Sequence, residues 1–185
     1  MLFRSNKRFK DVTGWQPRYP TVREGWPAVV AEMGAAPPRV GLLARLGLLV
    51  LALTNLQLGL WATLAPHSFY NSFPGAGRHW VAVDGPFNEH LVRDFGGLNL
   101  ALGLLTIVAL VVGTRVLVAL AAGAWIVWSV PHVLYHALNL GVYSSGDKVA
   151  NMVSLSVTIV VPALLLWAAY KIRPASSSRW SAASP

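Results

Sequence analysis

The chain has 185 residues, of which 55% are hydrophobic and only 12% are charged. This composition is too apolar for an ordinary soluble domain of this length and indicates a single membrane-embedded domain. The absence of cysteine excludes disulfides, thiolate metal sites and a cysteine nucleophile.

Residues 1–40 are rich in Arg, Lys, Pro and Trp and show no extended helical repeat. They predict a basic cytoplasmic N-terminal arm, in which a short interfacial helix around Pro27–Met33 is one option. The net charge of +8 comes mainly from basic residues that flank the apolar runs. This placement favours anionic lipid as the partner and argues against nucleic acid.

Four apolar runs follow the arm, at about residues 42–65, 95–112, 116–138 and 149–170. A helix needs about 20 apolar residues to cross the hydrocarbon core of a bilayer, and all four runs come close to this length. Lipid offers open backbone groups no hydrogen-bond partner, so helices are the expected structure. The sequence therefore predicts an all-α fold, an integral membrane four-helix bundle over residues 41–171.

The connections between the runs differ in length and composition. Residues 66–94 form a predicted outer loop in which aromatic residues alternate with Pro and Gly, which suits a compact interfacial cap or an ordinary aromatic belt. Residues 113–115 are a tight turn that makes the second and third helices antiparallel neighbours. Residues 172–185 are rich in Ser and Ala and predict a disordered cytoplasmic tail.

The distribution of Lys and Arg predicts a multi-pass protein of the cell membrane with both termini in the cytoplasm. Twelve of the fifteen basic residues then lie inside, and only Arg78, Arg93 and Lys148 lie outside. The same orientation places all five histidines near the outer side. These are His67, His79, His90, His132 and His136.

Polar residues at the start of the second apolar run predict one wall of a pocket. If the helix begins near Asn88, the spacing of His90, Asp94, Gly97 and Ala101 places them on one face. The two small residues would let a neighbouring helix approach closely, so this face is expected to point into the bundle.

The end of the third helix supplies a second polar set. His132, His136 and Asn139 share one face, and Asn151 arrives at the same level from the fourth helix. Because the second and third helices are antiparallel neighbours, the two sets are expected to meet. The predicted outward-facing cluster consists of His90, Asp94, His132 and His136, with Glu89, Arg93, Asn139 and Asn151 in support.

Three uses of this cluster remain open at the level of sequence. The three imidazoles and the carboxylate of its four central residues suit a zinc, iron or copper ion. The same groups suit proton relay or hydrogen bonding to a quinone head group. In the third use the polar residues are structural and hold the helices in register. The sequence identifies no catalytic residue and does not decide whether the protein is an enzyme.

Pro66, Phe73-Pro74 and Asp94-x-x-Gly97, within a stretch from Leu42 to Tyr170, resemble the DoxX-like family of small four-helix bacterial membrane proteins. This resemblance implies four short helices and, as for some members, association with membrane redox systems that use quinones. It carries over no catalytic residue. The basic arm and the third-helix histidine pair lie outside the family pattern.

These observations predict a small integral membrane protein whose outward-facing His/Asp polar cluster is associated with redox chemistry or a small ligand. The competing prediction is a non-catalytic accessory subunit or assembly factor of a membrane complex. The expected partners are the lipid bilayer and either other membrane subunits or further copies of this chain.

Overall fold

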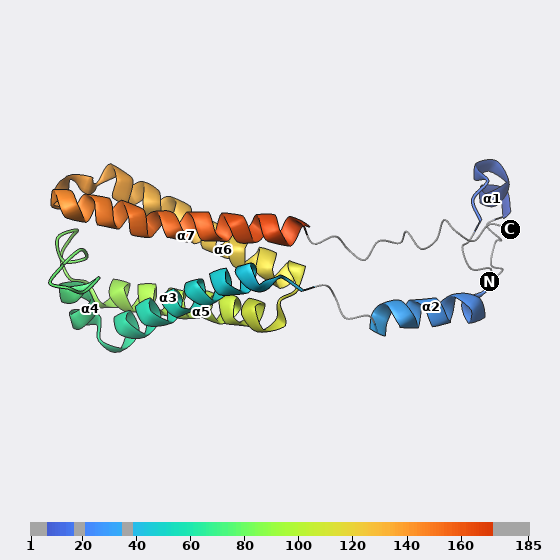
Figure 1. Ribbon diagram of the computed structural model, residues 1–185, viewed down its shortest axis with the longest axis horizontal. Coiled ribbons are helices and arrows are strands. Elements are labelled where there is room, and N and C mark those ends of the chain that lie inside the picture. The colour runs from blue at the N-terminus through green and yellow to red at the C-terminus, as the bar shows by residue number, and fades with distance from the viewer. Residues whose placement is uncertain (1–6, 17–20, 35–38, 172–185) are drawn as a thin grey trace. The chain divides into compact units, whose positions relative to one another are not determined.

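The computed structural model describes residues 7–16, 21–34 and 39–171, which belong to two separate units, residues 1–37 and 38–185 (Figure 1). The first unit contains helices α1 (Lys7–Thr13) and α2 (Val22–Gly34), so helix extends well beyond the short segment considered for the arm. Thr21 explains where α2 begins, because its hydroxyl oxygen accepts from the Glu24 amide and its hydroxyl donates to the Glu24 carboxylate. The tail predicted over residues 172–185 lies outside the described residues.

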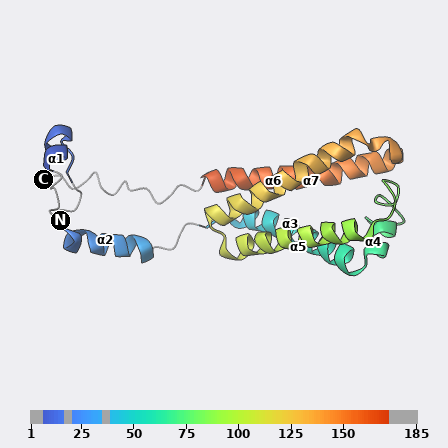
Figure 2. The ribbon, with the colours of Figure 1, turned by 180° about the vertical axis from the view of Figure 1, so that it is seen from behind.

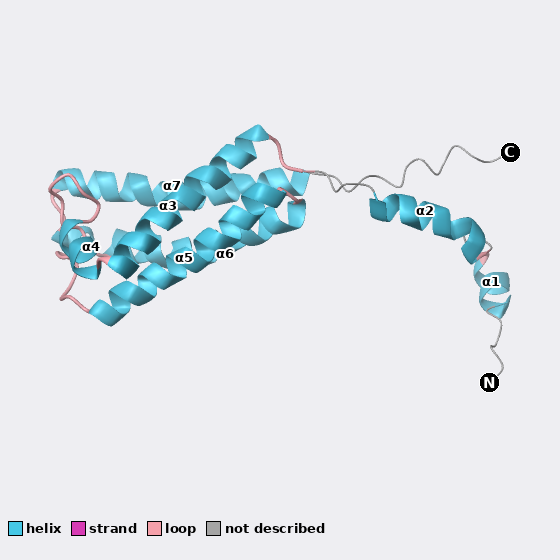
Figure 3. Cartoon of the chain, turned by 90° about the horizontal axis from the view of Figure 1, so that it is seen from below, coloured by secondary structure: helices cyan, strands magenta, loops and turns pink. Residues whose placement is uncertain are grey.

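The second unit is built from four helices, each long and apolar enough to cross a membrane. They are α3 (Leu42–Leu64), α5 (Glu89–Val112), α6 (Arg115–Leu138) and α7 (Ser145–Lys171). The short helix α4 (Pro66–Ser72) and the 3-10 turn η1 (Leu140–Val142) lie in the connections (Figure 3). The described residues contain no strand, only an isolated bridge between Arg39 and Thr114, which confirms the predicted all-helical class.

Two of the four long helices begin earlier than the apolar runs predict. α5 begins at Glu89 and α7 at Ser145, so the predicted outer loop over residues 66–94 shrinks to a connection over residues 73–88. Side-chain caps explain both starts. The Asn88 side chain accepts a hydrogen bond from the Leu91 amide, and the Ser144 hydroxyl accepts one from the Asp147 amide.

The four long helices pack as two antiparallel pairs, α3 with α5 and α6 with α7. Figures 1 and 2 show the pairs meeting near the α5–α6 turn and separating toward α4. The larger hydrophobic core lies where they meet, and it includes Leu48 of α3, Ala109 of α5, Trp125 of α6 and Leu165 of α7. The separation leaves space between the pairs at the α4 end.

Small residues allow the close contact between α3 and α5. A Cβ atom added at Gly59 would lie 2.8 Å from the Leu100 side chain, and one added at Gly96 would lie 2.8 Å from the Thr63 backbone nitrogen. Gly103 is similarly close to Asn55. Only glycine permits this separation between the two backbones, as is common where apolar helices associate.

The face of α5 that was predicted to point into the bundle points away from it. His90, Asp94, Gly97 and Ala101 are all exposed, and a Cβ atom at Gly97 would meet nothing within 4 Å. The buried face instead contains Gly96. A step of one residue rotates the helix face by about 100°, so the correct choice between two adjacent glycines decides which side chains are buried.

This packing predicts opposite outcomes for the same substitution at two adjacent glycines. We expect Gly96→Leu to destabilise the protein by about 1–3 kcal/mol, because the added side chain overpacks the α3–α5 contact. Gly97→Leu is the matched control and should leave stability unchanged or slightly raised. Thermal unfolding of both variants in detergent checks this, and equal midpoints would contradict the assigned packing face.

Candidate functional site

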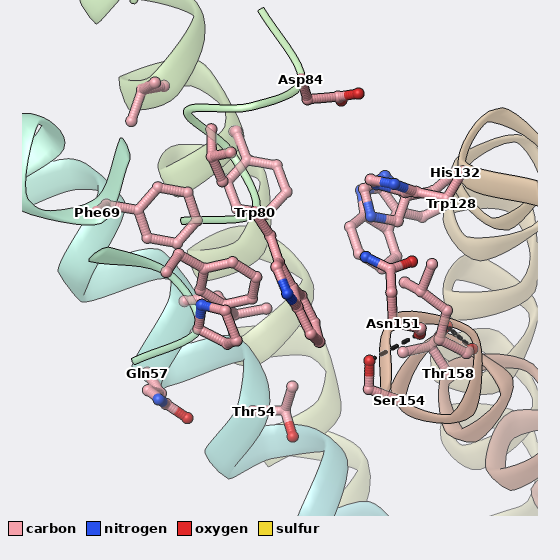
Figure 4. A pocket seen from close by; sticks show the side chains of 18 of the residues that line it. Thr54, Gln57, Phe69, Trp80, Asp84, Trp128, His132, Asn151, Ser154 and Thr158 are labelled. Atoms are coloured by element: carbon pink, nitrogen blue, oxygen red, sulfur yellow. Dashed lines mark hydrogen bonds between the residues drawn. The ribbon is translucent and has the colours of Figure 1, made fainter. Parts of the chain in front are cut away.

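A cavity of about 630 Å³ lies between the two helix pairs at the α4 end of the second unit (Figure 4). We call it the cleft. Its volume lies in the range of small-molecule sites, and most of its surface is apolar. Five aromatic side chains from α4, α5, α6 and the connection over residues 73–88 contribute to its lining. They are Phe69, Phe73, Trp80, Phe95 and Trp128.

Ring contacts fix the aromatic side chains of the cleft relative to one another. Phe69 lies with its ring centroid 5.0 Å from that of Phe73 and 5.6 Å from that of Phe95. Phe95 in turn lies 6.3 Å from Trp128 on α6. Figure 4 shows Phe69 and Trp80 on one wall, opposite His132, Trp128 and Asn151. The ring contacts therefore link the two walls, and the cavity of about 630 Å³ lies between them.

Two imidazoles on α6 provide polar atoms in this aromatic surface. The spacing of four residues places Trp128, His132 and His136 along one stripe of the helix, with 4.8 Å between the centroids of each successive pair. Both histidines are half-buried and line the cleft. His136 Nδ1 lies 3.3 Å from the hydroxyl of Tyr143, which holds that ring in position.

Asn151 brings a second kind of polar group into the cleft. Asn151 is only 3% exposed, and no described residue donates a hydrogen bond to its side-chain oxygen Oδ1. Figure 4 shows its side chain on the same wall as the His132 ring. A buried carbonyl oxygen without a donor costs about 1–3 kcal/mol, so a ligand that donates a hydrogen bond here would gain affinity.

The connection over residues 73–88 is fastened to the start of α7 by a group of contacts that we call the latch. Trp80 is 7% exposed, and its Nε1 donates to the Asp147 carboxylate at 2.9 Å. The Arg78 guanidinium lies 3.0 Å from the same carboxylate oxygen. The Tyr143 hydroxyl lies 3.3 Å from the Trp80 carbonyl. The latch therefore joins the two helix pairs across the α4 end of the cleft.

Tyr143 supports the latch as a neutral hydrogen-bond donor. Burial, followed by the nearby Asp84 carboxylate, raises the pKa of Tyr143 to about 12. The hydroxyl keeps its proton at neutral pH and can donate to the Trp80 carbonyl oxygen.

The structure brings together only part of the predicted polar cluster. His132, His136 and Asn151 line the cleft, whereas His90 and Asp94 do not. The latter two form a pair at 3.2 Å, with side chains that are 87% and 62% exposed. In residues 7–16, 21–34 and 39–171, no three His, Asp or Glu side chains are placed to hold a metal ion. The proposed ligand set for zinc, iron or copper is therefore not assembled.

The remaining predicted residues stabilise helix ends rather than lining the cleft. Arg93 lies 2.8 Å from the Glu89 carboxylate and also donates to the Thr63 carbonyl in the last turn of α3. Asn139 donates from its side chain to the Tyr135 carbonyl at 2.8 Å, at the end of α6. The Arg93 contact gives a carbonyl at the end of α3 a donor, whereas the Tyr135 carbonyl also accepts from the Asn139 backbone amide.

Several residues of the cleft were not predicted from the sequence. Trp128 could have been predicted from the sequence, because it lies four residues before His132 and must share its helix face. Trp80 could not have been predicted, because the hydrogen bond that positions it joins it to Asp147, 67 residues along the chain. Asp84 lines the cleft from the same connection.

Comparisons with protein families, with curated proteins and with solved structures find no match to this chain. Similarity to the DoxX-like family therefore stays a prediction from a few residues.

The latch predicts that removal of the Asp147 carboxylate loosens the connection over residues 73–88. We expect Asp147→Ala to speed amide hydrogen exchange in residues 73–84, because the Trp80 indole and the Arg78 guanidinium both lose their acceptor. Lys148→Ala is the neighbouring control. Mass spectrometry of exchange in detergent checks this, with residues 99–112 as the internal reference. Unchanged exchange in residues 73–84 would show that the latch does not hold the connection.

Proposed function

We propose that this protein spans a membrane and binds a small lipophilic ring compound of the quinone class in the cleft. The observation that carries the proposal is the combination, in one aromatic cavity, of two imidazoles and a buried carboxamide oxygen without a donor. A hydrophobic pocket with a few convergent polar groups is the usual form of a small-molecule site.

The chemistry of a quinone matches both kinds of surface. Its flat ring can stack between the aromatic side chains of the two walls, since offset stacking and edge contacts stabilise such pairs. A carbonyl oxygen of the quinone can accept a hydrogen bond from His132. A hydroxyl of the reduced form can donate to Asn151 Oδ1, which has no other donor among the described residues. The cleft thus suits both oxidation states.

The alternative of an accessory subunit with a purely structural cluster explains less. Structural polar residues inside a membrane satisfy one another, as Ser129 does by donating to the Thr158 carbonyl at 2.9 Å. Buried side-chain oxygens of Asn55, Thr63, Asn99 and Asn151 all lack a partner among the described residues, but of these four residues only Asn151 lines the cavity of about 630 Å³. These two features favour ligand binding over a role in packing alone.

We also propose that the four long helices cross the cell membrane with both termini in the cytoplasm. The distribution of basic residues supports this orientation, since twelve of the fifteen Lys and Arg would lie on the cytoplasmic side. The cleft would then lie toward the outer side of the membrane, near the headgroup level.

Binding measurements test the proposed ligand class directly. We expect the wild-type protein in lipid nanodiscs to bind a decyl-substituted benzoquinone or its quinol in calorimetric titrations. Asn151→Leu should weaken quinol binding about 5- to 150-fold, because an uncharged hydrogen bond in a buried site is lost, which is worth about 1–3 kcal/mol. His132→Phe should weaken quinone binding by a similar factor while keeping the ring stack with Trp128.

His90→Phe provides the matched control, because His90 lies at the same end of the fold but is exposed and outside the cleft. It should bind like the wild type. Thermal unfolding of each variant separates loss of binding from loss of fold. Equal binding by the wild type, Asn151→Leu and His132→Phe would contradict the proposal.

The absence of native cysteine allows a direct test of orientation. We expect Gly141→Cys, between α6 and α7, to react with a membrane-impermeant maleimide on intact cells. Ser177→Cys, near the C-terminus, should react only after the membrane is permeabilised. The opposite pattern would invert the proposed orientation.

A further inference from the structure

The latch spans the α4 end of the cleft, between the connection over residues 73–88 and the start of α7. Trp80 lines the cleft, and its indole is bonded to Asp147 on α7. Arg78 pairs with the same carboxylate and the Tyr143 hydroxyl donates to the Trp80 carbonyl, so three contacts must break before the connection over residues 73–88 can move away. A route from the aqueous side would require this rearrangement.

The side of the cleft between α3 and α7 is lined by helices rather than by the connection over residues 73–88. The two helices touch near the α5–α6 turn, where a Cβ atom added at Gly47 would lie 3.3 Å from Val161 and 3.6 Å from Leu165. Closer to α4, side chains of α3 and α7 line the cavity. Figure 4 shows Thr54 and Gln57 of α3 on one side of the cavity and Ser154 and Thr158 of α7 on the other. We call the region between these four residues the side gap.

Three of the four residues of the side gap have short side chains whose hydroxyls are already bonded, whereas the fourth, Gln57, carries a longer carboxamide side chain that is exposed. Thr54 donates to the Val50 carbonyl at 2.9 Å, and Ser154 donates to the Asn151 carbonyl at 2.8 Å. Thr158 donates to the Leu155 carbonyl at 2.7 Å. Because each hydroxyl is satisfied on its own helix, it presents little unpaired polarity to a passing molecule. Short side chains also leave room that Leu or Phe would fill.

The surface around the side gap is apolar and exposed. Leu53 and Leu60 of α3 are 57% and 48% exposed, and Val153 and Val157 of α7 are 62% and 43% exposed. On the proposed membrane-spanning helices, such a surface contacts lipid chains. The side gap therefore opens from the cleft toward the hydrocarbon layer rather than toward water.

We propose that the ligand enters and leaves the cleft from the lipid phase, through the side gap, and that its apolar chain stays in this gap while its ring lies among the aromatic residues. This inference rests on the proposed function and narrows the ligand to a chain-bearing molecule dissolved in the bilayer. A water-soluble ring compound would have to pass the latch.

Reversible crosslinking tests the route. The pair Thr54→Cys/Ser154→Cys is joined across the side gap by a bis-methanethiosulfonate linker, and the pair Arg78→Cys/Asp147→Cys is joined across the latch. The readout is the rate at which bound, isotope-labelled decyl benzoquinone exchanges with unlabelled compound in nanodiscs. We expect the side-gap link to slow exchange at least tenfold and the latch link to leave the rate unchanged. Removal of the linker by reductant, followed by desalting, should restore fast exchange.

A variant without a linker gives an independent measurement. Ser154→Phe places a bulky ring in the side gap and should slow exchange, whereas Val153→Phe, on the neighbouring lipid-exposed position, should not. Exchange that is slowed by the latch link and insensitive to both side-gap changes would overturn the proposed route but leave binding intact. A wild-type protein that binds no quinone would overturn the proposed function and this inference with it.

Discussion

The close glycine contact between α3 and α5 is the constraint on which the rest of the second unit depends. Gly59 and Gly96 let these two backbones approach to a distance at which an added Cβ atom would clash, and Gly103 makes a further tight contact with Asn55. Large aromatic side chains at the α4 end, including Phe95 and Trp128, occupy the region where the two pairs separate. Tight packing within each pair and wide spacing between the pairs together produce a cleft in a fold of only four long helices.

The packing of the helices also decides which polar side chains in the second unit have hydrogen-bond partners. In lipid, a polar side chain finds its partner on its own helix, on a neighbouring helix or on a ligand. Ser129 and Thr106 find partners within the fold, on the Thr158 carbonyl and on the Leu102 carbonyl. Asn151 lines the cleft, and its buried Oδ1 has no donor among the described residues, which makes it the one such residue that a ligand in the cleft lies close to.

The sequence predicted the helices well because their apolar length is a direct requirement of lipid. It also predicted His132, His136 and Asn151 as neighbours, since helix spacing and a tight turn place them at one end. It failed for His90 and Asp94, because the sequence contains two adjacent glycines and spacing alone cannot tell which one faces α3. The Trp80–Asp147 bond could not be predicted, since it depends on how a connection without periodicity folds across two helix pairs.

The central claim is that a ring compound lies between the Trp80 wall and the α6 wall of the cleft. Photolabelling with an azido-substituted benzoquinone that bears a decyl chain tests this most directly, with mass spectrometry to locate the modified residues. The account predicts labels within residues 128–136 or on Trp80, reduced by excess unlabelled decyl benzoquinone. Labels confined to lipid-exposed positions such as Val153, and insensitive to the competitor, would contradict it.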